Sequence, residues 1–103
     1  MKTIWHSEAK AGRHKVAAYI HKWFGIKRVK RFRQEVDDVV KMILRHPNIG
    51  PIDPLYADRS ETYRSVIING LSKLVYRVDD DIIHIVGFWD TRQEPTSQAA
   101  QTE

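Results

Sequence analysis

The fold is decided by residues 63–89, which read YRSVIINGLSKLVYRVDDDIIHIVGFW. Three runs rich in β-branched and aromatic residues are separated by Asn69-Gly70 and by the aspartates at 79–81, a pattern typical of a three-stranded antiparallel meander. Both Asn and Gly accept the positive φ angles of a type I′ turn, so we predict a two-residue hairpin loop here. The resulting cross-strand pairs are Ile68 with Leu71, Val66 with Lys73, and Arg64 with Val75.

This register predicts which side chains share a face of the sheet, because side chains alternate along each strand. One face carries every Lys, Arg and His of the three strands and consists of Arg64, Val66, Ile68, Leu71, Lys73, Val75, Arg77, Ile82, His84, Val86 and Phe88. The other consists of Tyr63, Ser65, Ile67, Ser72, Leu74, Tyr76, Val78, Ile83, Ile85, Gly87 and Trp89. We expect the uncharged face to form the core and the basic face to be the working surface, although its cations could equally be ordinary solvated side chains. The basic face is also apolar enough that another part of this chain, or a partner chain, should cover it.

Two helices are predicted in the first half of the chain. Apolar residues recur at three- and four-residue intervals in residues 7–24 and again in residues 26–46, as on the buried side of amphipathic helices. The first stripe is Ala9, Gly12, Val16, Ile20, Trp23 and Phe24, and the second is Ile26, Val29, Phe32, Val36, Val39, Val40, Ile43 and Leu44. Gly25 ends the first helix and Pro47 stops the second, so the pair should fold back as an antiparallel hairpin.

The complete order is therefore β-α-α-β-β-β, an α+β fold with the helix hairpin on one face of a small, mainly antiparallel sheet. Residues 2–5 provide a short edge strand, and the proline-containing segment 47–61 crosses from the helices to the sheet. We expect a single domain over residues 1–95 and a flexible tail over residues 96–103.

Composition limits the class of protein. A chain of 103 residues with 42% hydrophobic and 29% charged residues fits one soluble domain. No apolar run approaches the ~20 residues of a membrane span, and the absence of cysteine fits a cytoplasmic location. The formal net charge is +4, with twelve Lys/Arg against four Asp/Glu in residues 1–46. The basic run at residues 27–33 indicates either a nucleic-acid patch or a solvated helix face.

The sequence contains no recognisable metal or cofactor motif, and we expect neither group. His14 and His21 are seven residues apart on the first predicted helix, without a third ligand on that element. The remaining candidates for chemistry are basic side chains of the meander and one arginine just past it: Arg64, Lys73, Arg77, His84 and Arg92. Such a set could bind phosphate or stabilise charge in RNA cleavage, but only His84 has an intrinsic pKa suited to proton transfer near neutral pH.

Four motifs occur in a fixed order: HPNIG at 46–50, YRS at 63–65, KLVYRV at 73–78 and IVGFWDTRQEP at 85–95. With the predicted order of elements, they make the chain resemble the RelE/ParE superfamily of type II toxin-antitoxin toxins over residues 1–95. The resemblance implies a growth-inhibiting bacterial toxin and a cognate antitoxin that wraps it, in a hetero-oligomer or around a toxin dimer. Contact with that partner would account for the apolar side chains of the basic face, and we assign it to Val66, Ile68, Leu71, Val86 and Phe88.

Activity within the superfamily divides, because RelE-like members cleave messenger RNA on the ribosome whereas ParE-like members inhibit DNA gyrase. The resemblance implies that the nucleases use an arginine before the central hairpin turn, an arginine after the last strand, and a tyrosine or histidine near the C-terminus. In this chain the first position holds Ile68 and the second holds Arg92. Residues 95–103 contain neither Tyr nor His. We therefore predict a ParE-like gyrase inhibitor, with a RelE-like endonuclease as the alternative and an inactive relic as a third reading.

Enzymatic activity stays open at this point. The predicted target-binding residues are Arg64, Lys73, Arg77 and Arg92. If the chain is a nuclease, the candidate catalytic residues are Arg64, His84 and Arg92.

Overall fold

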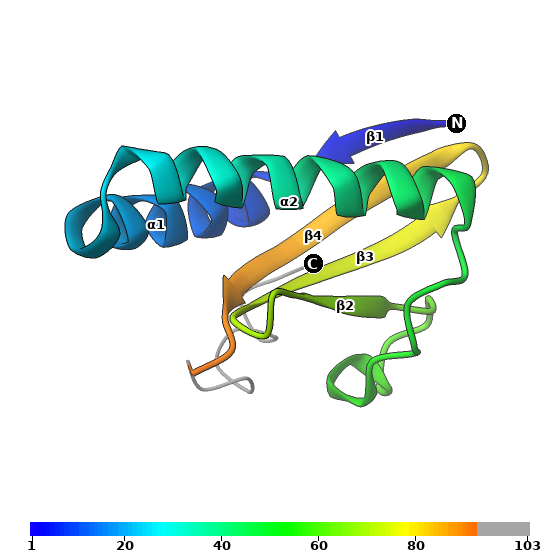
Figure 1. Cartoon of the computed structure of the whole chain (residues 1–103). Coiled ribbons are helices and arrows are strands. Elements are labelled where there is room, and N and C mark those ends of the chain that lie inside the picture. Colours follow the sequence, from blue (N-terminus) through cyan, green and yellow to red (C-terminus); the bar gives the residue numbers. More distant parts are fainter. Residues whose placement is uncertain (93–103) are drawn as a thin grey trace.

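The computed structural model of this chain describes residues 1–92. Its elements are β1 (Lys2–Trp5), α1 (Ser7–Phe24), α2 (Ile26–Arg45), the 3-10 helix η1 (Pro54–Tyr56), β2 (Arg64–Ile68), β3 (Ser72–Asp79) and β4 (Ile82–Asp90). The predicted α+β fold and the order β-α-α-β-β-β are therefore confirmed (Figure 1). The predicted end of the domain at residue 95 and the predicted flexible tail at 96–103 lie outside the described residues.

Helices α1 and α2 form a hairpin because a single glycine joins them. Gly25 has a φ of 85°, a left-handed value that glycine adopts readily, and its N–H donates to the carbonyl of His21 at 3.1 Å. The buried residues of α2 lie on one stripe and are Val29, Phe32, Val36 and Ile43. Those of α1 are only Ala9 and Ile20. The second helix therefore contributes more of the core than the first.

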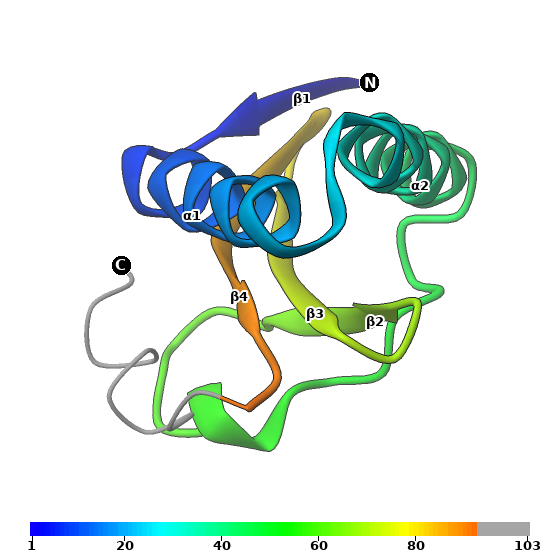
Figure 2. The ribbon, with the colours of Figure 1, turned by 60° about the vertical axis from the view of Figure 1, so that its left-hand side comes forward.

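The four strands are ordered β1-β4-β3-β2, with β1 parallel to β4 and the other neighbours antiparallel. The first and last strands of the described chain thus lie side by side, and both helices pack over the same face of the sheet (Figure 2). Helix α1 approaches β4 closely, since a Cβ placed on Gly12 would lie 1.8 Å from the carbonyl oxygen of Phe88. Only glycine fits at this crossing.

The predicted pairing of β2 with β3 is wrong by one residue. Asn69 and Gly70 do form the turn, with φ angles of 53° and 69°, and the N–H of Leu71 donates to the carbonyl of Ile68 at 3.1 Å. However, Ile68 pairs with Ser72, so Leu71 becomes a third loop residue. A shift of one residue moves a whole strand to the other face.

Because of this shift, the side chains of β2 lie on the opposite faces of the sheet from those predicted. Arg64 pairs with Tyr76 and Val66 pairs with Leu74, and both tyrosine and leucine belong to the core under the helices. Arg64, Val66 and Ile68 therefore lie on the helix side of the sheet, not on the face that carries Lys73.

A β-bulge causes a second error in the predicted faces. Val75 pairs with Gly87 whereas Tyr76 pairs with Ile85, so β4 has one extra residue at this point. An extra residue exchanges the two sides of the strand beyond it. Phe88 consequently packs under the helices and Trp89 packs on the opposite side, the reverse of the prediction.

Each side of the sheet has its own core. Under the helices, the strand residues of the core are Ile68, Leu74, Tyr76, Ile83, Ile85 and Phe88. On the other side, Val75, Val86 and Trp89 are buried with Tyr56 and Tyr63. The chain's own segment between α2 and β2 thus covers the second face, as one of the two predicted alternatives required.

Most of the apolar residues assigned to a partner contact are instead packed within the chain itself. Ile68, Val86 and Phe88 are buried inside the chain, and Val66 is packed against the core under the helices. Of the five apolar residues expected to contact a partner, only Leu71 is exposed.

No helix within residues 1–92 has the length and apolarity needed to cross a membrane.

Candidate functional site

Arg64 joins the start of β2 to the segment that leaves α2. Its Nη1 donates to the carbonyl of Gly50 at 2.9 Å and lies 3.4 Å from that of Asn48. The neighbouring Tyr76 hydroxyl donates to the carbonyl of Pro47 at 2.7 Å and accepts from the N–H of Gly50 at 3.1 Å. Arg64, predicted to bind a target, therefore helps to fix residues 47–50 on the sheet.

Lys73 and Arg77, on the other face, are engaged in ion pairs. Lys73 Nζ lies 2.7 Å from Asp53 Oδ2, and that carboxylate is almost fully buried. Asp53 also accepts the N–H of Leu55 at 3.0 Å, which starts η1. Arg77 Nε lies 3.1 Å from Glu61 Oε2. Both cations therefore hold the segment 53–61 against the second face.

His84 lies where β4 meets β1. Its Nδ1 is 2.9 Å from Nε2 of His6, and the two rings meet edge to face with centroids 5.1 Å apart. One imidazole must donate and the other accept in this contact. This contact links His6, the residue that precedes α1, to β4.

Arg92 is the most exposed of the five predicted site residues. Its guanidinium makes a forked contact with Asp90, with Nε to Oδ1 at 2.9 Å and Nη2 to Oδ2 at 2.5 Å, and it lies 5.3 Å from the ring centroid of Tyr19. The hydrogen bonds from Arg92 lower the pKa of Asp90. The same partnership, chiefly the hydrogen bond to Asp90, raises the pKa of Arg92. Asp90 thus holds Arg92 against α1.

The three candidate catalytic residues lie on different parts of the sheet. Arg64 is opposite Tyr76 on the helix side, and His84 is opposite Arg77 on the other side. Arg92 follows the end of β4 that borders the β2–β3 loop, whereas Arg64 begins β2 at the far end of that hairpin. The structure therefore does not bring these three side chains together.

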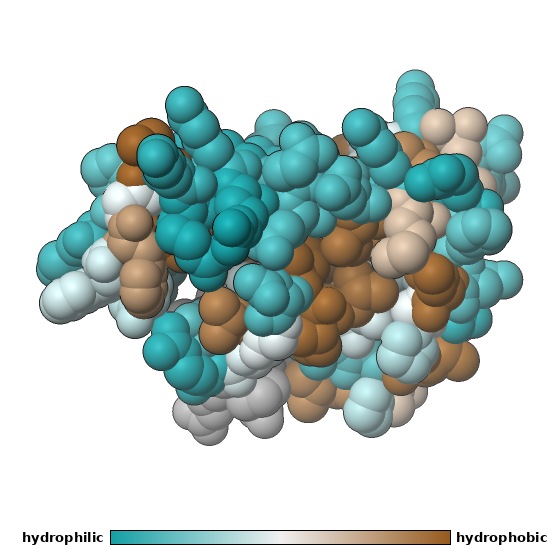
Figure 3. All heavy atoms as spheres, viewed as in Figure 1, coloured by the Kyte–Doolittle hydropathy of each residue, from teal (hydrophilic) through white to brown (hydrophobic). Residues whose placement is uncertain are grey.

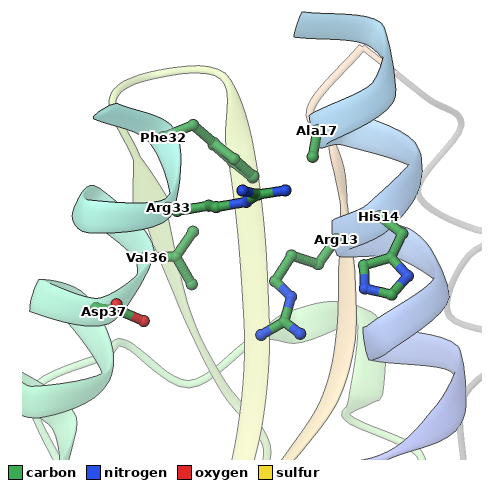
Figure 4. Close-up of a pocket in the computed structure, with 7 residues that line it drawn as sticks. All are labelled: Arg13, His14, Ala17, Phe32, Arg33, Val36 and Asp37. Atoms are coloured by element: carbon green, nitrogen blue, oxygen red, sulfur yellow. The ribbon is translucent and has the colours of Figure 1, made fainter. Parts of the chain in front are cut away.

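The helical hairpin has basic and exposed apolar surfaces. Arg13 of α1 and Arg33 of α2 both point into a cleft between the helices (Figure 4). The cleft has a volume of about 260 Å³ and is lined by Arg13, His14, Ala17, Phe32, Arg33, Val36 and Asp37. Two guanidiniums beside apolar lining residues favour a ligand that has an anionic group and an apolar part. Apolar surface also reaches the exterior between α2 and β2 (Figure 3).

The exposed aromatic cluster was not foreseen from the sequence. Tyr19, Trp23, Phe24 and Ile26 are 43%, 61%, 60% and 51% exposed and form what we call the hairpin tip. The periodicity placed Trp23 and Phe24 on the buried stripe because it cannot show where the sheet beneath the helix ends. No cluster of three or more potential metal ligands occurs within residues 1–92.

A family model described as the ParE toxin of the type II toxin-antitoxin system parDE matches residues 3–95. The chain belongs to the ParE toxin family. A solved structure, the chromosomal ParDE toxin-antitoxin system from P. aeruginosa, has a similar fold, with a TM-score of 0.70 and 18% identity over 87% of this chain and 95% of that one. None of the curated proteins compared matches. The predicted resemblance to the RelE/ParE superfamily is thus confirmed.

Proposed function

We propose that this ParE-family toxin inhibits DNA gyrase by binding it and that a cognate antitoxin neutralises it in the cytoplasm. The observation that supports inhibition by binding is the dispersal of the candidate catalytic residues. Cleavage of RNA by attack of the 2′-hydroxyl needs a base, an acid and charge stabilisation at one phosphate. Arg64 and His84 lie on opposite faces, and Arg92 lies at the other end of the sheet.

The internal contacts of the cations support the same proposal. Arg64, Lys73 and Arg77 each hold part of the segment 48–61, so recruiting them to a substrate would release that segment. Most of the exposed basic side chains are instead on the helices, where they can contact a target by binding alone. We therefore place target binding on the helical hairpin and Arg92.

The test is a supercoiling assay with purified gyrase and relaxed plasmid. We expect the wild-type chain to inhibit supercoiling in proportion to its concentration, and His84→Ala to inhibit equally after its folding is checked. Addition of the antitoxin should restore supercoiling. Full supercoiling in the presence of the chain, together with cleaved ribosome-bound transcripts in cells that express it, would overturn the proposal in favour of an endonuclease.

A further inference from the structure

The hairpin tip extends past the sheet that the helices cover. In Figure 1 the link between α1 and α2 lies beyond the ends of the strands. The last fully packed residue of α1 is Ile20 and the first of α2 is Val29, and every residue between them is at least partly exposed. The apolar stripe of α1 therefore continues for one turn with no strand beneath it.

The tip is a continuous patch and not a set of scattered residues. Tyr19 and Trp23 are one helical turn apart, and their ring centroids are 6.5 Å apart. Phe24 and Ile26 flank Gly25, around which a Cβ would meet nothing within 4 Å. The short link keeps these exposed side chains close together along the chain. An exposed apolar patch of this kind marks a contact with another molecule.

The charge around the hairpin tip indicates the kind of molecule that binds there. Residues 9–34 contain nine Lys/Arg and no Asp or Glu. Two carboxylates, those of Glu35 and Asp90, share a pocket with Tyr19 and Phe24, and that of Asp90 is paired with Arg92. Lys22 and Lys27 are exposed on either side of it. A second copy of this chain would bring two such stretches together, which like-charge repulsion opposes. The complementary partner is acidic.

The rings favour a protein partner over a nucleic acid. Bases stack on open aromatic faces, but the Lys22 ammonium lies 5.3 Å over the Trp23 ring and the Arg92 guanidinium lies 5.3 Å over that of Tyr19. The two rings are also inclined at 52° to each other, so successive bases could not stack on both in parallel. Ile26 adds an aliphatic surface suited to apolar side chains.

We propose that the hairpin tip docks an acidic segment of the cognate antitoxin. Apolar side chains of that segment cover Trp23, Phe24 and Ile26, and its carboxylates meet Lys22 and Lys27. The antitoxin is the fitting occupant because a patch this apolar needs a lasting cover, as in stable complexes. This inference rests on the proposed function for the existence of the antitoxin, but not for the identity of the target.

The test measures binding of the purified antitoxin, the product of the adjacent reading frame, to variants of the full chain. We expect the double change Trp23→Ser and Phe24→Ser to weaken binding about tenfold or more. Lys22→Glu with Lys27→Glu should also weaken it, mainly at low salt. Thermal unfolding of each variant checks that it is folded.

Matched controls use residues that are similarly exposed elsewhere. Ile52 and Ile67 are 61% and 54% exposed and lie outside the helical hairpin, so Ile52→Ser with Ile67→Ser controls for loss of apolar surface. Lys2→Glu with Lys41→Glu controls for net charge. Both control variants should bind the antitoxin within about twofold of wild type.

Wild-type affinity in the tip variants would overturn the inference, as would absence of any complex with the wild-type chain. The same variants in the supercoiling assay separate this inference from the proposed function. Loss of gyrase inhibition with intact antitoxin binding would assign the tip to the target instead. If the wild-type chain leaves gyrase unaffected, the proposed function fails while the affinities still decide the docking site. Binding of a single-stranded oligonucleotide that depends on Trp23 would also overturn it.

Discussion

At the scale of single residues, the Tyr76 hydroxyl connects β3 to the segment that leaves α2. It extends from the middle of β3, beneath the helices, to the backbone of Pro47 and Gly50. Gly50 is confined there as well, because a Cβ on it would lie 2.8 Å from the carbonyl oxygen of Ser65 and 3.0 Å from the Tyr76 oxygen. The exit from α2 is therefore fixed by one side chain and one glycine.

Tyr76→Phe should lower the free energy of unfolding by about 1–3 kcal/mol, because the buried N–H of Gly50 and the partly buried carbonyl of Pro47 both lose their partner. Chemical denaturation measures this loss, and amide exchange at Gly50 should quicken. Ile67→Val, at an exposed strand position, is the control and should change stability by less than about 0.5 kcal/mol. Unchanged exchange at Gly50 would contradict this role for the hydroxyl.

The same hydroxyl gives a prediction for alkaline pH. Burial raises the pKa of Tyr76 above its ordinary value of 10.0, despite opposing effects from Gly50 and Arg64. The unfolded state therefore loses this proton first, and stability falls as pH rises above about 10. The difference in unfolding free energy between wild type and Tyr76→Phe should shrink over that range. A constant difference would show that the folded pKa is not raised.

Gly12 fixes the approach of α1 to β4. In Gly12→Ala the methyl group would overlap the backbone of Phe88, which cannot move like a flexible side chain. We expect a loss of about 3 kcal/mol or more in unfolding free energy, at the upper end for overpacking. Ala18→Ser, on the exposed side of the same helix, should cost less than about 1 kcal/mol. Thermal or chemical unfolding of the two variants tests the close contact.

At the scale of elements, the segment between α2 and β2 acts as a cover for the second face of the sheet. It packs Tyr56 and Tyr63 onto Val75, Val86 and Trp89. Ion pairs from β3 hold it in place. The two cations predicted to recognise a target are thus part of the reason that this face is closed.

Lys73→Met should destabilise the chain by about 3 kcal/mol, because it leaves the buried Asp53 carboxylate without its cation. The double variant Lys73→Met with Asp53→Asn should recover part of that loss, since no charge is then left buried. Limited proteolysis should cut residues 51–63 faster in the single variant. Equal stability of the single and double variants would contradict the ion pair's role.

The helices and strands could be predicted from the sequence because periodicity, turn residues and glycine position are local signals. The pairing of strands could not be predicted as fully. Asn69 and Gly70 form the expected turn, but nothing local shows that Leu71 joins the loop. The bulge opposite Val75 and Tyr76 has one local signal, Gly87, because an isolated glycine within a strand often marks a bulge. That signal alone does not show which neighbouring residue is left unpaired.

At the scale of the whole molecule, the family could be predicted from the ordered motifs, but the candidate site could not be assembled from them. The predicted register places four of the five basic residues on one face, with Arg92 just past it, and this register is wrong for Arg64. Ion pairing of Lys73 and Arg77 depends on a segment without periodicity, whose path the sequence does not reveal. The hairpin tip was missed because exposure depends on where the sheet ends.

The distribution of charge over the molecule follows from these contacts. Cations of the sheet are largely matched by nearby acids or carbonyls, whereas the helices present a basic surface and an apolar tip. Such a molecule is suited to binding acidic macromolecular surfaces. The candidate catalytic side chains, Arg64, His84 and Arg92, are separated by the fold. This separation supports inhibition of the target by binding.

The most direct test of this claim is separate pulse labelling of DNA and protein synthesis after induction of the chain without its antitoxin. We predict that DNA synthesis stops first while translation continues, and that His84→Ala behaves like the wild type. An early stop of protein synthesis with cleaved ribosome-bound messages, abolished by His84→Ala or by Arg92→Ala, would contradict it.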